Sequence, residues 1–190
     1  MSLRPLIIIL WNMFDPIYFL FTRLHYIPST TEKPCVFRVR ITKYRGKDVI
    51  LSDGTSIKKN DLLLKIHLHN SKILKESLII RHSLKKGRMI YKMVLNSMPM
   101  LAEYIEKHPK RTDIKGIIGV TTINKGVKTL GFDLVFPSNK FYQIMKRLMQ
   151  FPIYLLSSSS FSIEQLKKSK PVYLFMSKDK LSHKYLKFKV

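Results

Sequence analysis

Two segments with alternating side chains, residues 36–44 and 62–69, most constrain how this chain can fold. In the first, VFRVRITKY, apolar residues alternate with arginine and threonine. In the second, LLLKIHLH, leucine and isoleucine alternate with Lys65, His67 and His69. Successive side chains of a β-strand point to opposite faces, so each segment predicts a strand with one apolar and one polar face.

The rest of the chain alternates predicted strands and helices. Asp53-Gly54, within residues 48–57, is a strong hairpin signal. Residues 85–108 have the apolar spacing of a helix, in which Pro99 predicts a break, with Ser97 as the cap of a second helix. Further strands are expected over 115–122, 132–136 and 171–177, further helices over 138–151 and 162–170, and a loop at the serine run 157–160. This order predicts an α/β fold, or α+β as the alternative, with a mixed, mainly antiparallel central sheet flanked by helices.

The chain is predicted to form one domain, with an apolar helical segment over residues 1–26 and an α/β body over residues 27–190. Asp15-Pro16 lies in the middle of the apolar segment and is a helix-start signal. Two short helices are therefore favoured over one membrane span. Burial against the body is the first interpretation, docking on a membrane surface the second, and a true span the last.

The charge balance favours an anionic neighbour. The chain has 35 Lys and Arg against 12 Asp and Glu, a formal net charge of +23. Nucleic acid, phospholipid headgroups or an anionic ligand would fit, and a general solubility feature is the alternative. Nucleic acid is disfavoured because the basic residues are spread out and the aromatic residues sit in apolar runs. The single cysteine, Cys35, favours a cytoplasmic location, with peripheral association at the inner membrane face as a further option.

The polar sides of the two alternating strands would meet if both strands lie in one sheet. A metal there would need a third ligand from Asp53, Asp61 or Asn70, and the cationic neighbours would repel a divalent ion. We therefore expect no metal and predict an anion-binding face, with a solvated strand face as the alternative. Its residues would be Arg38, Arg40, Lys65, His67 and His69.

Two glycine-containing segments are further candidates. SLKKGRM, residues 83–89, would open a helix, and backbone amides at a glycine turn there would bind phosphate, unless it is a generic turn. Residues 117–132 contain three glycines and predict either a ligand-facing loop or tight packing. The side chains concerned are Lys85, Lys86 and Arg88 around Gly87, and Thr121, Thr122 and Lys125 in the second segment. No motif of a nucleophile with its base is present, so no catalytic residue is assigned and enzymatic activity is left open.

Four blocks of sequence, WNMFDPIYFLFTRL, YRGKDVILSDGTSIKKNDLLLKIHLHN, GVTTINKGVKTLGF and VYLFMSKDKL, together resemble the YkoP-like domain family over nearly the whole chain. That family occurs as small proteins of Bacillus-type bacteria and as a domain attached to polysaccharide deacetylases. The resemblance implies a context in envelope polysaccharide metabolism, with envelope-polysaccharide enzymes or an anionic membrane surface as partners. It transfers no catalytic residues.

The order of elements from strand 62–69 through Gly87 to VYLFMSKDKL is also similar to the GNAT acyltransferase superfamily. This second resemblance implies a GNAT-like fold and coenzyme A as cofactor, with its pyrophosphate at residues 85–88. Met89 stands where a second small residue would be expected. The leading hypothesis is a non-catalytic domain, without a cofactor, that binds an anionic ligand, lipid headgroup or partner. The alternatives are an acyltransferase-like enzyme and a nucleic-acid-binding protein.

If His67 and His69 belong to a polar strand face, replacing both by glutamine should leave the fold intact, because neither ring would be part of the apolar core. Circular dichroism and urea unfolding of the His67→Gln/His69→Gln variant test this expectation. A variant that fails to fold would show that the two histidines are core residues.

Overall fold

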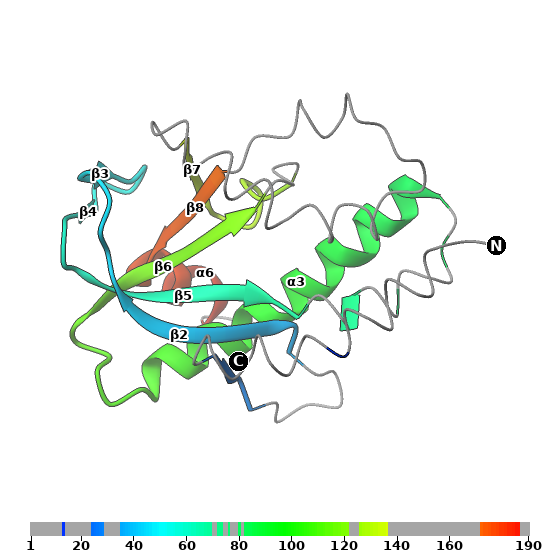
Figure 1. Cartoon of the computed structure of the whole chain (residues 1–190), viewed down its shortest axis with the longest axis horizontal. Coiled ribbons are helices and arrows are strands. Elements are labelled where there is room, and N and C mark those ends of the chain that lie inside the picture. Colours follow the sequence, from blue (N-terminus) through cyan, green and yellow to red (C-terminus); the bar gives the residue numbers. More distant parts are fainter. Residues whose placement is uncertain are drawn as a thin grey trace.

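The computed structural model of the chain describes residues 13, 24–28, 35–69, 72–73, 76, 80, 82–121, 126–136 and 172–186. Within these residues the main sheet has six strands in the order β1-β2-β5-β6-β8-β7 (Figure 1). Neighbouring strands are antiparallel, except that β5 and β6 are parallel. This confirms the predicted α/β class with a mixed, mainly antiparallel sheet. The strands are β1 His25–Tyr26, β2 Phe37–Lys43, β5 Leu62–Leu68, β6 Ile114–Thr121, β7 Asp133–Val135 and β8 Val172–Ser177.

A β-hairpin, formed by β3 Val49–Ile50 and β4 Ser56–Ile57, is the second sheet. Its turn requires a residue with positive φ, and Gly54 supplies it at 84°. The Leu51 amide donates to the Thr55 carbonyl at 2.9 Å, and the Gly54 amide donates to the Leu51 carbonyl at 3.0 Å. The hairpin predicted at Asp53-Gly54 is confirmed.

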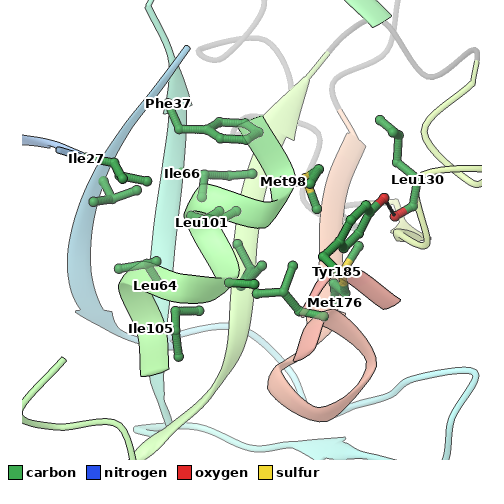
Figure 2. Packing of buried hydrophobic residues seen from close by; sticks show 14 of the residues in the cluster. Ile27, Phe37, Leu64, Ile66, Met98, Leu101, Ile105, Leu130, Met176 and Tyr185 are labelled. Carbon is green, nitrogen blue, oxygen red and sulfur yellow. Dashed lines mark hydrogen bonds between the residues drawn. The ribbon is translucent and has the colours of Figure 1, made fainter. Parts of the chain in front are cut away.

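Helix α3, Ser83–Glu106, connects the parallel strands β5 and β6 and lies on one face of the main sheet (Figure 1). Parallel neighbours need such a crossover, because no tight turn can join them. Met98, Leu101 and Ile105 from its C-terminal half are completely buried in the main core (Figure 2). Strand alternation brings Leu64 and Ile66 of β5 to the same core.

The opposite face of the sheet carries a smaller core beneath the β3–β4 hairpin. Leu63 of β5, the neighbour of Leu64, belongs to this second core, as strand alternation requires. Ile57 of the hairpin is completely buried there. The sheet therefore has an apolar layer on each side, and the second layer includes Tyr44, Leu51, Ile57, Leu63, Ile118 and Phe175.

The expected break at Pro99 is wrong, since α3 continues through it. Pro99 cannot donate the usual bond to the Leu95 carbonyl, but both residues lie on the exposed side of the helix. Burial of the next turns in the main core holds the helix together beyond this point. Ser97 is not a cap: its hydroxyl donates to the Met93 carbonyl at 2.9 Å and accepts from the Val36 amide at 3.1 Å.

The expected glycine turn before α3 is also wrong. The helix begins at Ser83, and the Lys86 amide already donates to the His82 carbonyl at 3.0 Å. Gly87 is therefore in the second turn of the helix, where its amide takes part in helical hydrogen bonding. Residues 83–89 are therefore the first turns of the helix and not a glycine turn that precedes it.

One described helix was not expected from the sequence. Helix α6, Lys178–Tyr185, follows β8 directly, and its N-cap Ser177 accepts a bond from the Lys180 amide at 3.0 Å. The Tyr185 hydroxyl at its end donates to the Leu130 carbonyl at 2.8 Å (Figure 2). Burial, with a contribution from Tyr91, raises the pKa of Tyr185 to about 12. The ranges predicted at 138–151, 157–160 and 162–170, and most of 1–26, lie outside the described residues.

Replacing Gly116 by alanine should lower the free energy of unfolding by about 1–3 kcal/mol, because the added Cβ would lie 2.5 Å from the Met176 carbonyl oxygen in β8. Gly87→Ala is the matched control. No atom lies within 4 Å of a Cβ at that position, so the helix should gain about 0.5–1 kcal/mol. Urea unfolding measures both values, and a destabilised Gly87→Ala variant would contradict a helical Gly87.

Candidate functional site

Basic side chains from β2 and β5 occupy neighbouring positions on one face of the main sheet. The antiparallel register pairs Arg38 with His67 and Arg40 with Lys65. Val39, between the two arginines, is in the main core under α3. By strand alternation the four polar residues belong to the opposite face of the sheet.

His69 extends this group beyond the end of β5. Its amide donates to the Val36 carbonyl at 2.8 Å, so the pairing with the segment before β2 continues. As it lies two residues beyond His67, it falls on the same side. The register therefore places these residues on one face of the sheet, as the sequence predicts, although Arg38 is buried there. We call Arg38, Arg40, Lys65, His67 and His69 the basic face.

Arg38 is the most buried member of the basic face, with 3% of its surface exposed. Its guanidinium donates to the Tyr26 hydroxyl at 2.7 Å and lies 5.0 Å from the centre of the Tyr26 ring. The Tyr26 ring is in turn 5.4 Å from the His69 ring. These contacts hold Arg38 and His69 in place at one end of the basic face. Arg40 and Lys65, at the other end, are half-buried.

The other predicted site residues do not join the basic face. Thr121, the last residue of β6, is half-buried and by alternation from Ile118 falls on the α3 side of the sheet. Lys85, Lys86 and Arg88 belong to α3, which covers that same side. Thr122 and Lys125 lie outside the described residues, so the predicted loop around them is described only in part.

A polar cluster that sequence reasoning missed joins the hairpin to the C-terminal part of the sheet. The Ser52 amide and hydroxyl both donate to the Asp133 carboxylate at 3.1 Å. The Lys180 ammonium donates to the Ser52 hydroxyl at 2.9 Å and lies 3.5 Å from the Asp133 carboxylate. Asp53 accepts a bond from the Ser177 hydroxyl. We call Ser52, Asp53, Asp133, Ser177 and Lys180 the polar cluster.

Electrostatics inside the polar cluster favour the ionised form of Asp53. Burial alone would raise its pKa, but hydrogen bonds from Ser177 and Thr55 and the charge of Lys180 outweigh burial and lower it. Ser177 is 1% exposed, and its hydroxyl is engaged both as donor to Asp53 and as acceptor for the Lys180 amide. The arrangement therefore anchors the hairpin and does not present a serine nucleophile.

Cys35 is a buried thiol at the entry to β2. Burial raises its pKa, although hydrogen bonds from Phe37 and Ser97 and the charge of Lys72 act in the opposite direction. The thiol is therefore protonated at neutral pH, whereas nucleophilic attack requires the thiolate.

Neither a metal site nor a membrane span is found among the residues that the structure describes. Across those residues, no three His, Cys, Asp or Glu side chains gather closely enough to hold a metal ion. None of the helices placed there combines the length and the apolar character needed to cross a bilayer.

A sequence signal for the polar cluster exists in hindsight. Ser177 precedes Lys178-Asp179, and a serine followed by an acidic residue in the first helical turn is typical of a helix N-terminus. Its pairing with Asp53 spans 124 positions and depends on the sheet order, which places β8 beside β6. No local pattern could have indicated that contact.

Comparison with known proteins gives one family and one close relative. The model of the YkoP domain matches residues 4–185. The chain is 49% identical over 178 residues to "Uncharacterized protein YkoP" of Bacillus subtilis (strain 168), covering 94% of this chain and 95% of that protein. No solved structure matches.

Because the pKa of Asp53 is lowered in the folded state, its ionisation stabilises the fold above the pKa of an unfolded aspartate. That contribution is lost as the pH falls through the lower, folded value, below about pH 5. Asp53→Asn should therefore be less stable than the natural protein at pH 6, and the difference should shrink towards pH 2.5. Urea midpoints across this range measure the effect. If the urea midpoints of the natural protein and of Asp53→Asn differed by the same amount at every pH, this expectation would be wrong.

Proposed function

The chain belongs to the YkoP domain family, and we propose that it binds a phosphate-bearing anionic ligand at the basic face without transforming it. The observation that carries the proposal is the β2–β5 register, which sets Arg38 beside His67 and Arg40 beside Lys65. Directly opposed residues have Cβ atoms about 4.5–5.5 Å apart. Several cationic groups therefore fall within reach of one ligand.

The excess of basic residues in the chain supports an anionic ligand. The 12 acidic residues of the chain are far fewer than its 35 basic ones, so its own carboxylates cannot balance them all. A phosphate group fits the forked geometry of arginine better than a carbonyl or hydroxyl would.

The chemistry of the two buried nucleophiles supports binding without reaction. The Ser177 hydroxyl is engaged in the polar cluster, and the pKa of the Cys35 thiol is raised by burial. Coenzyme A binding at residues 85–88 stays a prediction. It presupposed a glycine turn before the helix, whereas Gly87 lies inside the helix. Envelope polysaccharide metabolism, nucleic-acid binding and a cytoplasmic location at the inner membrane face likewise stay predictions.

Calorimetric titration with sodium pyrophosphate tests the proposal. The Arg40→Gln/Lys65→Gln variant should bind pyrophosphate at least about tenfold more weakly than the natural protein, because each lost charge-assisted bond contributes on the order of 1.5 kcal/mol or more. These two side chains are half-buried, unlike Arg38, so the fold should tolerate their replacement.

The matched control is Lys110→Gln/Arg111→Gln, which also removes one lysine and one arginine. Both residues are exposed in the loop between α3 and β6. The affinity of this control variant for pyrophosphate should stay within about twofold of the natural value, since salt screens exposed charges that do not contact the ligand. Equal losses in both double variants, or no heat of binding at millimolar pyrophosphate, would overturn the proposal.

A further inference from the structure

The N-terminal half of α3 contributes no fully buried apolar residue to the main core. The fully buried core residues of this helix, Met98, Leu101, Ala102 and Ile105, all lie in its C-terminal half. In Figure 1 the N-terminal half runs beyond the end of β5. From this half only partly buried residues such as Tyr91 and Val94 pack against the core, and Leu84, Lys85, Arg88 and Lys92 are exposed.

Two leucines, one near the start of α3 and one near its middle, are exposed on the same side of this helix. Leu84 is 81% exposed and Leu95 is 37% exposed. Eleven residues separate them, which on an α-helix corresponds to about 20° of rotation and about 16 Å of axial distance. They therefore lie near one line along the helix, and Tyr91, which falls on this line between them, packs against the main core.

Basic residues lie to one side of the line through these two leucines. Arg88 and Lys92 follow Leu84 by one and two turns and are exposed, as is Lys85. The chain has no Asp or Glu between residues 77 and 102. We call Leu84, Lys85, Arg88, Lys92 and Leu95 the outer α3 face.

We propose that the outer α3 face docks on the surface of an anionic phospholipid bilayer. Exposed leucines beside lysine and arginine are the arrangement by which interfacial helices insert apolar side chains between lipids while their cations meet the headgroups. A polyanionic nucleic acid would engage the charges but leave Leu84 and Leu95 in water. Among the residues that the structure describes, the aromatic side chain of this helix half, Tyr91, is half-buried, packs against the main core and bonds Thr129 at 3.2 Å. It is therefore not placed to stack on bases.

This docking surface is separate from the proposed ligand site. α3 covers one side of the main sheet, and the basic face lies on the other. Loss of pyrophosphate binding in Arg40→Gln/Lys65→Gln and loss of vesicle binding in variants of the outer α3 face can therefore be observed independently. Either proposal can fail while the other stands.

Flotation with phosphatidylcholine vesicles, with and without phosphatidylglycerol, tests the charged part of the surface. The natural protein should float with the anionic vesicles only, and less so at high salt. Lys85→Gln/Arg88→Gln/Lys92→Gln should reduce partitioning about a hundredfold at low salt, since each basic residue near the surface contributes about fivefold. The control Arg45→Gln/Lys47→Gln/Lys58→Gln also removes two lysines and one arginine, but from exposed positions around the hairpin. It should change partitioning into the vesicles far less.

Exposed apolar residues elsewhere provide a second matched comparison. Leu84→Ser/Leu95→Ser should lose vesicle binding at high salt, where the charges contribute little, whereas Ile50→Ser/Phe136→Ser should retain it. Ile50 and Phe136 are 78% and 60% exposed, and none of the four replaced residues belongs to a buried core cluster. An environment-sensitive fluorophore on a Leu84→Cys variant should shift to the blue with anionic vesicles, and buried Cys35 should not compete for the label.

Three outcomes would overturn the proposal. The first is equal loss of flotation in the two triple variants, which would mean that only total charge matters. The second is no flotation of the natural protein with anionic vesicles. The third is tight binding of a DNA duplex that is lost in the Lys85/Arg88/Lys92 variant while the fluorophore at position 84 gives no shift with vesicles.

Discussion

The packing of the C-terminal half of α3 against β5, β6 and β8 is the interaction on which the rest of the structure depends. Met98, Leu101 and Ile105 are completely buried there (Figure 2), and each such side chain contributes about 1.5–3 kcal/mol through removal of apolar surface from water. This packing fixes the crossover between β5 and β6, and with it the parallel pair at the centre of the sheet. It also determines which side of every strand faces the helix.

Two chemically different surfaces follow from that choice of side. Along β5, Leu64 and Ile66 enter the main core, so Lys65 and His67 fall on the other face. A register shift of one residue would exchange the two sets and place charges beneath α3. The basic face is thus held in register by the core on the far side of the same strands. The polar cluster performs a comparable task for the hairpin, which it ties to β7 and α6.

Local sequence patterns predicted the elements whose formation depends on residues close together in the sequence. Alternation identified β2 and β5 with errors of one residue at their ends, and Asp53-Gly54 identified the hairpin. Pro99 was misjudged because the burial of the turns beyond it outweighs the one hydrogen bond it removes. Gly87 was misjudged because a glycine without neighbours within 4 Å is tolerated inside a helix. The members of the basic face were predicted, since pairing of adjacent strands suffices to gather them. The bond between Asp53 and Ser177 was not, because it depends on the order of strands.

The position of β8 in the sheet has a consequence for how the chain matures. β8 lies between β6 and β7, although both of those strands precede it in the sequence. As the chain leaves the ribosome, β6 therefore has one unpaired edge until residues 172–177 emerge and insert beside it. An unpaired edge of this kind is a template for pairing with other chains. The nascent protein therefore passes through a stage in which β6 and β7 still lack the strand that pairs with both of them, and that stage is when it most needs protection from other chains.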